Sequence, residues 1–136
     1  MSDNKFIIYT DGGARGNPGP AGIGVVIYNE QRQVVDRLSE YLGVATNNQA
    51  EYKAVLAAFK RAKELEATEL DFYLDSELVV KQLRREYKVK NKDLASLFLE
   101  IHNLSLNFKK ISYTHIGREF NSVADALANE AMDRGK

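Results

Sequence analysis

Hydrophobic runs of strand length recur along this chain, and two of them end in an aspartate. The runs occupy residues 6–11 and 70–75, and their last residues are Asp11 and Asp75. Short apolar runs bounded by turn residues are typical of buried strands, and in open α/β sheets ligands gather outside the carboxyl ends of such strands. Two carboxylates at that place are costly to desolvate unless a cation meets them. The pattern therefore predicts a site for a divalent metal ion.

The remaining pattern combines further strands with amphipathic helices. After a Gly/Pro-rich stretch, residues 22–28 and 34–42 are typical of a hairpin, and with the first strand they make an antiparallel meander. The strand at 70–75 follows a helix, so it can lie parallel to the first strand. A fifth strand is predicted at 111–116. Helices are predicted at 46–65, 77–85, 93–106 and 122–134.

Composition and charge narrow the classes of function. The chain has 136 residues, the length of one domain, and 44% of them are hydrophobic, which suffices for a core. Lysine plus arginine equals aspartate plus glutamate at 19 each, so any basic surface for nucleic acid has to be local. The lack of cysteine excludes disulfides, thiolate zinc sites and cysteine nucleophiles. The first apolar run is too short for a signal peptide or a membrane span, so we expect a cytoplasmic protein.

Two further carboxylates are candidates because of their places on helices. Glu51 lies four residues before Val55 and seven before Ala58, in line with the apolar stripe of its helix. A glutamate in a first turn could also simply stabilise the helix N-terminus. Asp125 lies among alanines at the edge of the apolar stripe of the last helix, where a solvated or capping role explains it equally well. The presence of the two strand-end aspartates favours a metal-binding role for Glu51 and Asp125 as well.

Four sequence blocks follow one another at domain-scale spacing: YTDGGARGNPGPAGIG at 9–24, TNNQAE at 46–51, LDSE at 74–77 and HIGREFNSVAD at 115–125. Together they resemble the signature of type 1 ribonuclease H, the ribonuclease HI family, over nearly the whole chain. The resemblance implies one catalytic domain over residues 1–136 with the ribonuclease H-like α/β fold. In this fold a five-stranded mixed sheet, an antiparallel meander of three strands plus two parallel strands, is flanked by helices. The resemblance also implies an endonuclease that cuts the RNA strand of RNA/DNA hybrids and leaves 5′-phosphate and 3′-hydroxyl ends.

The resemblance gives a metal-binding role to four carboxylates, which are the four that the residue pattern singles out: Asp11, Glu51, Asp75 and Asp125. Carboxylate oxygens suit Mg²⁺ or Mn²⁺, whereas a chain with two histidines and no cysteine is a poor zinc binder. We expect two Mg²⁺ ions, with Mn²⁺ as a possible substitute. One would activate water and the other would stabilise the leaving 3′-oxygen.

His115 is the candidate for proton transfer. It lies at the end of the last predicted strand, before a Gly-containing loop and ten residues before Asp125, and it matches the mobile loop histidine of the family. A histidine with an ordinary pKa suits proton transfer or displacement of a product-side metal water. A surface histidine without a function is the alternative. His102, inside a predicted helix, is interpreted as structural.

The Gly/Asn blocks should recognise the substrate. Glycines allow close approach of the backbone to a ligand, and the ribose 2′-hydroxyl is what distinguishes RNA from DNA. Each of these residues could alternatively belong only to a turn or a helix cap. The resemblance implies that Thr46 holds a phosphate of the DNA strand and that the RNA side of the groove is lined by Gly12, Gly13, Asn17, Asn47, Asn48 and Glu77. Ser76, next to Glu77, is also expected to bind substrate.

One departure from the family concerns the grip on the substrate. Some members carry a basic protrusion, an extra helix and loop, but here the helix at 77–85 is followed almost at once by the next helix, so the chain resembles a short form. The segment 81–92 carries six cations against Glu86, a local charge of +5. We expect Arg85, Lys88 and Lys90 to bind the hybrid, although such a run is often only a solvated face. Arg15 and Arg118 are the alternative source of the grip.

Two other functions stay open from the sequence. A non-catalytic module for RNA/DNA hybrids or RNA could use the carboxylates to hold one structural ion. A related metal nuclease could act on double-stranded RNA or branched DNA. Clustered negative charge repels a phosphate backbone unless metal intervenes, which disfavours the first, and only the Gly/Asn blocks argue against the second. The expected partner is the hybrid duplex, with no membrane contact and no added hybrid-binding module, and the resemblance suggests a monomer.

Overall fold

A five-stranded sheet forms the centre of the fold. The strands are β1 (Lys5–Ala14), β2 (Gly19–Tyr28), β3 (Val34–Ala45), β4 (Glu69–Leu74) and β5 (Lys110–His115). The computed structural model describes residues 4–136, and the strands lie in the order β3-β2-β1-β4-β5. β2 pairs antiparallel with β1 and β3, whereas β4 pairs parallel with β1 and β5. The predicted mixed sheet is thereby confirmed.

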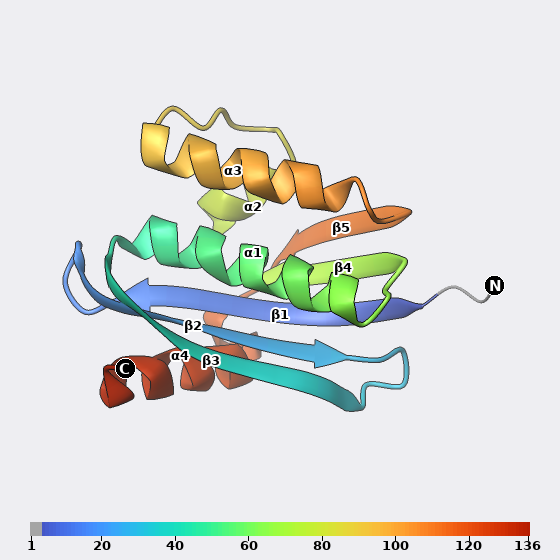
Figure 1. The fold of residues 1–136 in the computed structure, drawn as a ribbon, viewed down its shortest axis with the longest axis horizontal. Helices are drawn as coiled ribbons and strands as arrows, with labels where there is room; N and C mark the ends of the chain where they lie inside the picture. The colour runs from blue at the N-terminus through green and yellow to red at the C-terminus, as the bar shows by residue number, and fades with distance from the viewer. Residues whose placement is uncertain (1–3) are drawn as a thin grey trace.

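Helices cover both faces of the sheet. They are α1 (Asn47–Glu64), α2 (Glu77–Leu83), α3 (Lys92–Ser105) and α4 (Ser122–Arg134), with a short 3₁₀ turn, η1, at Arg118–Phe120. Figure 1 shows α1 and α3 above the sheet and α4 below it. No helix within residues 4–136 has the length and apolar character needed to cross a membrane.

The main core lies between α1 and the sheet. Tyr52 and Phe59 of α1 are fully buried, as are Ile8 of β1 and Phe72 of β4. The rings of Phe59 and Phe72 lie 4.8 Å apart between centroids. Because alternate strand residues point to this core, the residues between them point to the opposite face, where α4 packs.

The hairpin between β1 and β2 is longer than the sequence indicates. The Gly/Pro-rich stretch predicts a loop from residue 12 onward, but β1 continues to Ala14 and β2 begins at Gly19. Gly13 lies opposite Gly22 in this extension. Glycines are unfavourable in strands, so their local signal indicates a loop. The long hairpin places paired backbone directly beyond Asp11.

The end of α2 also differs from the prediction. The pattern predicts a helix to residue 85, but α2 ends at Leu83 because Arg85 has a left-handed backbone conformation, with φ of 64°. The Arg85 N–H donates to the carbonyl of Gln82 at 3.0 Å, and the Glu86 N–H donates to that of Lys81 at 2.8 Å. This hydrogen-bond pattern ends many helices, usually with glycine in place of arginine. The sequence therefore lacks the ordinary stop signal.

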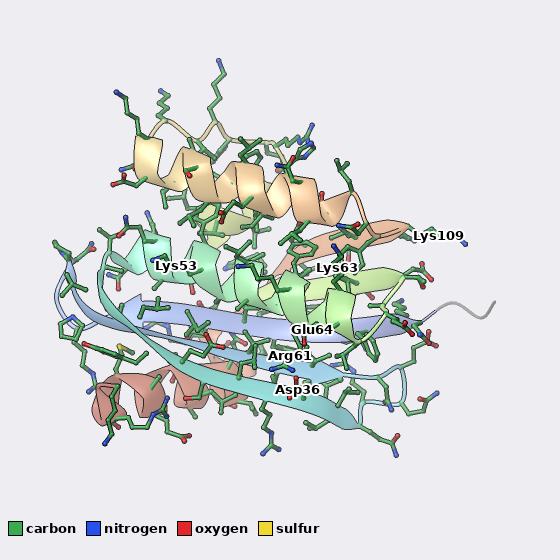
Figure 2. The ribbon with its side chains drawn as sticks, viewed as in Figure 1. Asp36, Lys53, Arg61, Lys63, Glu64 and Lys109 are labelled. Atoms are coloured by element: carbon green, nitrogen blue, oxygen red, sulfur yellow. The ribbon has the colours of Figure 1, made fainter. Side chains whose placement is uncertain are left out.

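Polar contacts secure the edge strand β3 from both faces of the sheet. Arg61 of α1 pairs with Asp36 of β3 at 3.0 Å and with Glu64 at 3.5 Å, as Figure 2 shows. From the other face, Arg134 of α4 donates to the carbonyl of Ser39 at 2.8 Å. An edge strand whose backbone is covered in this way is less open to pairing with another chain.

Candidate active site

Asp11 and Asp75 lie side by side where the parallel pairing of β1 with β4 ends. β1 and β4 are parallel, and their last paired residues are Thr10 and Leu74. Asp11 is the next residue of β1, and Asp75 directly follows β4. Both aspartates therefore lie at the carboxyl end of the parallel pairing of the central strand β1 with β4, as the two hydrophobic runs predict.

Glu51 reaches the aspartates because Gly12 allows α1 to approach β1 closely. A Cβ atom at Gly12 would lie 2.3 Å from the carbonyl carbon and oxygen of Ala50, so no residue with a side chain fits without movement of α1. This approach lets Glu51 Oε1 accept a hydrogen bond of 2.5 Å from the N–H of Gly12. Glu51 is 7% exposed, in keeping with its place on the apolar stripe. Gly12 thus has a structural role that the sequence did not reveal.

Small residues bring Asp125 to the same place from the other face of the sheet. A Cβ atom at Gly24 of β2 would lie 2.0 Å from the carbonyl oxygen of Ala124 in α4. Ala124 and Ala128 are buried against β2. Asp125 follows Ala124 and lines the pocket that also contains Asp11. The alanines around Asp125 are therefore explained by close packing of α4.

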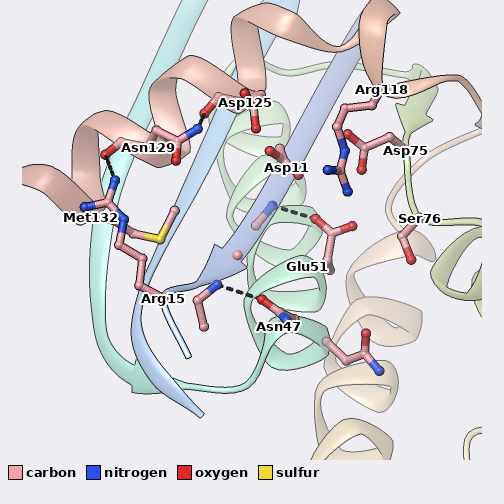
Figure 3. Close-up of a pocket in the computed structure, with 14 residues that line it drawn as sticks. Asp11, Arg15, Asn47, Glu51, Asp75, Ser76, Arg118, Asp125, Asn129 and Met132 are labelled. Carbon is pink, nitrogen blue, oxygen red and sulfur yellow. Dashed lines mark hydrogen bonds between the residues drawn. The ribbon is translucent and has the colours of Figure 1, made fainter. Parts of the chain in front are cut away.

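The carboxylates of Asp11, Glu51 and Asp75 form a tight group. Each offers an oxygen within 4.8 Å of oxygens of the other two. Asp125 is outside this group but lines the same open pocket, which has a volume of about 440 Å³. Figure 3 shows the four side chains around the pocket, each from a different part of the chain. A donor set of carboxylate oxygens is what hard divalent cations prefer.

Burial and crowding raise the pKa values of two of these carboxyl groups. Burial, followed by the charge of Asp75, raises the pKa of Asp11 to about 7. Burial is also the main reason that the pKa of Glu51 lies well above its ordinary value, and the charges of Asp11 and Asp75 add to it. A divalent cation would remove this cost by pairing with the ionised forms. The residues present therefore fit the metal that the sequence predicts.

Polar residues connect the β1–β2 hairpin to the start of α1 at the rim of the pocket. Asn47 Oδ1 accepts a hydrogen bond of 2.8 Å from the N–H of Ala14, and the Asn47 N–H donates to Asn17 Oδ1 at 3.1 Å. These contacts are visible in part in Figure 3. Of the residues predicted to bind substrate, those that line the pocket are Gly12, Gly13, Asn47, Asn48 and Ser76.

Thr46 and Asn17 line a second recess of about 260 Å³, between the N-termini of α1 and α3. Asn48 lines both this recess and the carboxylate pocket. Thr46 is the N-cap of α1, and its hydroxyl accepts a hydrogen bond of 3.1 Å from the N–H of Gln49. Thr46 therefore does cap α1, and from the same position it can also contact a ligand.

His115 and Glu77 lie beside the pocket and not in its lining. His115 pairs with Leu74 across β4 and β5, one residue before Asp75. Its Nδ1 lies 3.8 Å from Glu77 Oε2, and its side chain is 41% exposed. Glu77 also pairs with Lys81 Nζ at 3.3 Å. His115 is therefore near the carboxylates in the sheet but is oriented toward an acidic side chain of α2.

Ion pairs reduce the free positive charge of the segment between α2 and α3. Besides the pair of Lys81 with Glu77, Arg84 Nε lies 2.9 Å from Glu86 Oε2. Two of the six cations are thus locally neutralised. Sequence counting could not show this, because it depends on where α2 ends.

The remaining cations of this segment differ in their surroundings. Arg85 Nη2 lies 2.6 Å from Nδ1 of His102, which gives both residues a structural contact. Lys88 and Lys90 are exposed, and no salt bridge joins either to an acidic residue within residues 4–136. Lys92, the sixth cation, is exposed as well. Binding of the hybrid by this segment therefore depends mainly on its exposed lysines, of which Lys88 and Lys90 are the two predicted to bind.

Some pocket residues escaped the sequence analysis or were given only as alternatives. Arg15 and Arg118 line the pocket, and Arg15 Nη2 lies 2.5 Å from Asp133. Asn129 and Met132 line it from α4. They lie four and seven residues after Asp125, on the same face of the helix. Helical spacing from Asp125 was the signal that could have found them.

Comparison with known proteins places this fold and site in a family. A family model described as reverse transcriptase-like matches residues 9–131. The ribonuclease H of Ruthia magnifica is 35% identical over 152 aligned positions, which cover 96% of this chain and 97% of that protein. The chain belongs to the ribonuclease H family.

Two further relatives show how this ribonuclease H domain compares with others. The bifunctional protein Rv2228c of Mycobacterium tuberculosis is 43% identical over 130 residues, which cover 95% of this chain but only 36% of that protein. LC11-RNase H1, solved in complex with an RNA/DNA hybrid, is 43% identical, with a TM-score of 0.91 over 95% of this chain and 97% of that one. The chain therefore spans about a third of the Mycobacterium relative and nearly all of LC11-RNase H1.

The raised pKa of Asp11 predicts how stability depends on pH without metal. The folded parent keeps a proton on Asp11 up to about pH 7, whereas the unfolded chain releases it near pH ~4. A folded state that binds more protons than the unfolded state loses stability as pH rises. The Asp11→Asn variant lacks this loss, so it should gain stability relative to the parent over this range.

Urea unfolding of both proteins in EDTA, near pH 5 and near pH 7.5, measures this effect. We expect the difference in free energy of unfolding to grow by about 1 kcal/mol or more in favour of the variant. An equal difference at both pH values would show that the pKa of Asp11 is not raised.

Proposed function

We propose that this domain is a metal-dependent endonuclease that hydrolyses the RNA strand of RNA/DNA hybrids and leaves 5′-phosphate and 3′-hydroxyl ends. The observation that carries the proposal is the tight group of Asp11, Glu51 and Asp75 oxygens in an open pocket. Membership of the ribonuclease H family and the likeness to LC11-RNase H1, solved with a hybrid, support it.

In this proposal Asp11, Glu51, Asp75 and Asp125 hold two Mg²⁺ ions, and Mn²⁺ could replace them. When bound, such ions supply an activated water and stabilise the leaving 3′-oxygen. The protein residues hold the ions, and the backbone orients the carboxylates. The N–H of Gly12 fixes one oxygen of Glu51, and parallel pairing of β1 with β4 fixes the spacing of the two aspartates. No side chain has to form a covalent bond to the substrate.

Recognition of the RNA strand is assigned to the rim of the pocket. Asn48 and Ser76 line it close to the carboxylates, where they can hydrogen-bond to a ribose 2′-hydroxyl. The recess at Thr46 is assigned to a phosphate of the DNA strand, since the N-termini of α1 and α3 both favour negative charge there. Asn17, expected on the RNA side, lines this recess and not the carboxylate pocket.

A cleavage assay tests this function. RNA/DNA hybrid, double-stranded RNA, double-stranded DNA, branched DNA and single strands are incubated with the parent in Mg²⁺ or Ca²⁺. We expect the RNA strand of the hybrid to be cut in Mg²⁺ and bound without cutting in Ca²⁺. Asp75→Asn should abolish cutting, whereas Asp36→Asn, a matched change in an ion pair on β3, should not.

Each other result favours a different function. Binding of the hybrid without cutting in Mg²⁺ would indicate a binding module. Faster cutting of double-stranded RNA or branched DNA than of the hybrid would indicate a related nuclease. Full activity of Asp75→Asn would contradict the assignment of the metal site.

His115 is proposed to transfer a proton or to aid product release from its place beside Glu77. Its replacement by alanine should lower turnover by about 100-fold or less, because a positioned acid or base contributes roughly 10²–10⁴-fold. Affinity for the hybrid, measured in Ca²⁺, should stay nearly unchanged. Steady-state kinetics with saturating hybrid measure this, with His102→Ala as the control that keeps turnover. Parent-like turnover of His115→Ala would make it a surface histidine.

Lys88 and Lys90, together with Arg85, are proposed to bind the phosphate backbone of the hybrid. The variant with Lys88→Ala and Lys90→Ala should have a higher KM for every hybrid sequence and a kcat close to the parent's, since these contacts bind ground and transition states equally. The log–log salt dependence of binding should flatten by roughly two units.

Binding of a labelled hybrid in Ca²⁺ at several salt concentrations measures this slope. The matched control replaces Lys60 and Lys63 of α1, so it removes the same charge from another helix. If both double variants show the same slope as the parent, the segment between α2 and α3 is a solvated face.

A further inference from the structure

Asn121 contacts three of the parts of the chain that carry the candidate metal ligands. It is 1% exposed and lies directly before α4. Its Nδ2 donates to the backbone carbonyl of Thr10 at 2.9 Å and to Asp75 Oδ2 at 3.3 Å. The backbone carbonyl of Asn121 accepts a hydrogen bond of 3.0 Å from the N–H of Asp125. Thr10 directly precedes Asp11, so one buried residue links the chain at Asp11, Asp75 and Asp125.

The side chain of Asn121 does not do what an asparagine at a helix start ordinarily does. An N-cap asparagine accepts hydrogen bonds from the first N–H groups of its helix. Thr46, Ser76 and Asn91 do so with their side chains at the starts of α1, α2 and α3. Asn121 makes no such bond to α4. Its amide is turned to the sheet and Asp75 instead.

This arrangement has an energetic cost within the described residues. Asn121 Oδ1 and Thr10 Oγ1 are both buried and have no hydrogen-bond partner in residues 4–136. Buried polar atoms without partners are rare, because each costs about 1–3 kcal/mol. A residue chosen only for packing or capping would avoid that cost, so the amide's contact with Asp75 is the feature to explain.

We propose that Asn121 is a positioning residue that fixes the Asp75 carboxylate relative to Asp11 and Asp125, and thereby sets the affinity of the site for Mg²⁺. The inference rests on the proposed function, because it takes these carboxylates as the metal ligands. Asn121 acts on the metal through Asp75 and touches neither the ion nor the substrate. Residues that orient metal ligands in this way typically contribute 10–100-fold to metal affinity or activity.

Asn121→Ser is the informative variant. Serine is a good N-cap, so α4 can still begin at the same place, but its short side chain cannot donate to both Thr10 and Asp75. The second variant is Asn121→Ala, which removes every polar contact of the side chain. The matched control is Ser39→Ala. Ser39 Oγ also donates to a backbone carbonyl of α4, that of Leu127 at 2.7 Å, and Ser39 does not line the carboxylate pocket.

Calorimetric titration of each protein with Mg²⁺ alone and hybrid cleavage as a function of Mg²⁺ concentration test the proposal. For both Asn121 variants we expect Mg²⁺ affinity to fall by about 10-fold or more. The Mg²⁺ concentration for half-maximal cleavage should rise in parallel, and kcat at saturating Mg²⁺ should return to within a few-fold of the parent. Ser39→Ala should bind Mg²⁺ as the parent does, even if its melting temperature falls.

The proposal is overturned if the variants melt at a lower temperature but bind Mg²⁺ as tightly as the parent. It is also overturned if neither variant folds, since Asn121 would then be needed for the fold itself. A parent that binds Mg²⁺ but cuts no hybrid would contradict the proposed function. The titration needs no substrate, so it would still decide whether Asn121 sets metal affinity.

Discussion

Mutual repulsion of carboxylates crowded beside the central strands β1 and β4, where their parallel pairing ends, is the constraint on which the rest of the site depends. Asp11, Glu51 and Asp75 offer oxygens within 4.8 Å of one another, and burial together with repulsion raises the pKa of Asp11 to about 7. Such a group forms only if the surrounding chain forces it to. Gly12 allows α1 to contact β1, Gly24 allows α4 to contact β2, and Asn121 joins Thr10 to Asp75. The fold supplies the geometry, and a divalent cation would supply the missing positive charge.

Much of this could be predicted from the sequence because it follows from local pattern. Strand-length apolar runs and the order of elements predicted the sheet. Two parallel apolar runs, each followed by an aspartate, placed Asp11 next to Asp75, although β1 itself continues to Ala14. The buried stripe of α1 placed Glu51 inward. What escaped prediction depends on contacts between distant segments. Periodicity cannot reveal that Gly12 faces Ala50. Nor can it reveal that the Asn121 amide contacts Asp75 instead of capping α4. The β1–β2 hairpin was underestimated because its pairing overrides the poor strand propensity of glycine.

The number of charged residues in a segment predicted its free positive charge less well than the hydrophobic pattern predicted the fold. The segment between α2 and α3 carries a large formal surplus of positive charge, but the fold pairs Lys81 with Glu77 and Arg84 with Glu86. The left-handed conformation of Arg85 ends α2 early and directs that side chain to His102. Lys88, Lys90 and Lys92 remain as exposed lysines, and among the described residues no salt bridge joins them to an acidic residue. The proposed contact with the hybrid is therefore smaller than the sequence indicates.

The most direct test of the account is the effect of Mg²⁺ on thermal unfolding of the parent and of Glu51→Gln near pH 8. Glu51 is nine-tenths buried and its pKa is raised by burial and by its neighbours, so without metal the neutral glutamine should melt at the higher temperature. Added Mg²⁺ should raise the melting temperature of the parent and change that of Glu51→Gln much less, because a ligand stabilises the state that binds it. A parent whose melting temperature does not respond to Mg²⁺, or a variant that responds equally, would contradict the claim that these carboxylates are held together to bind metal.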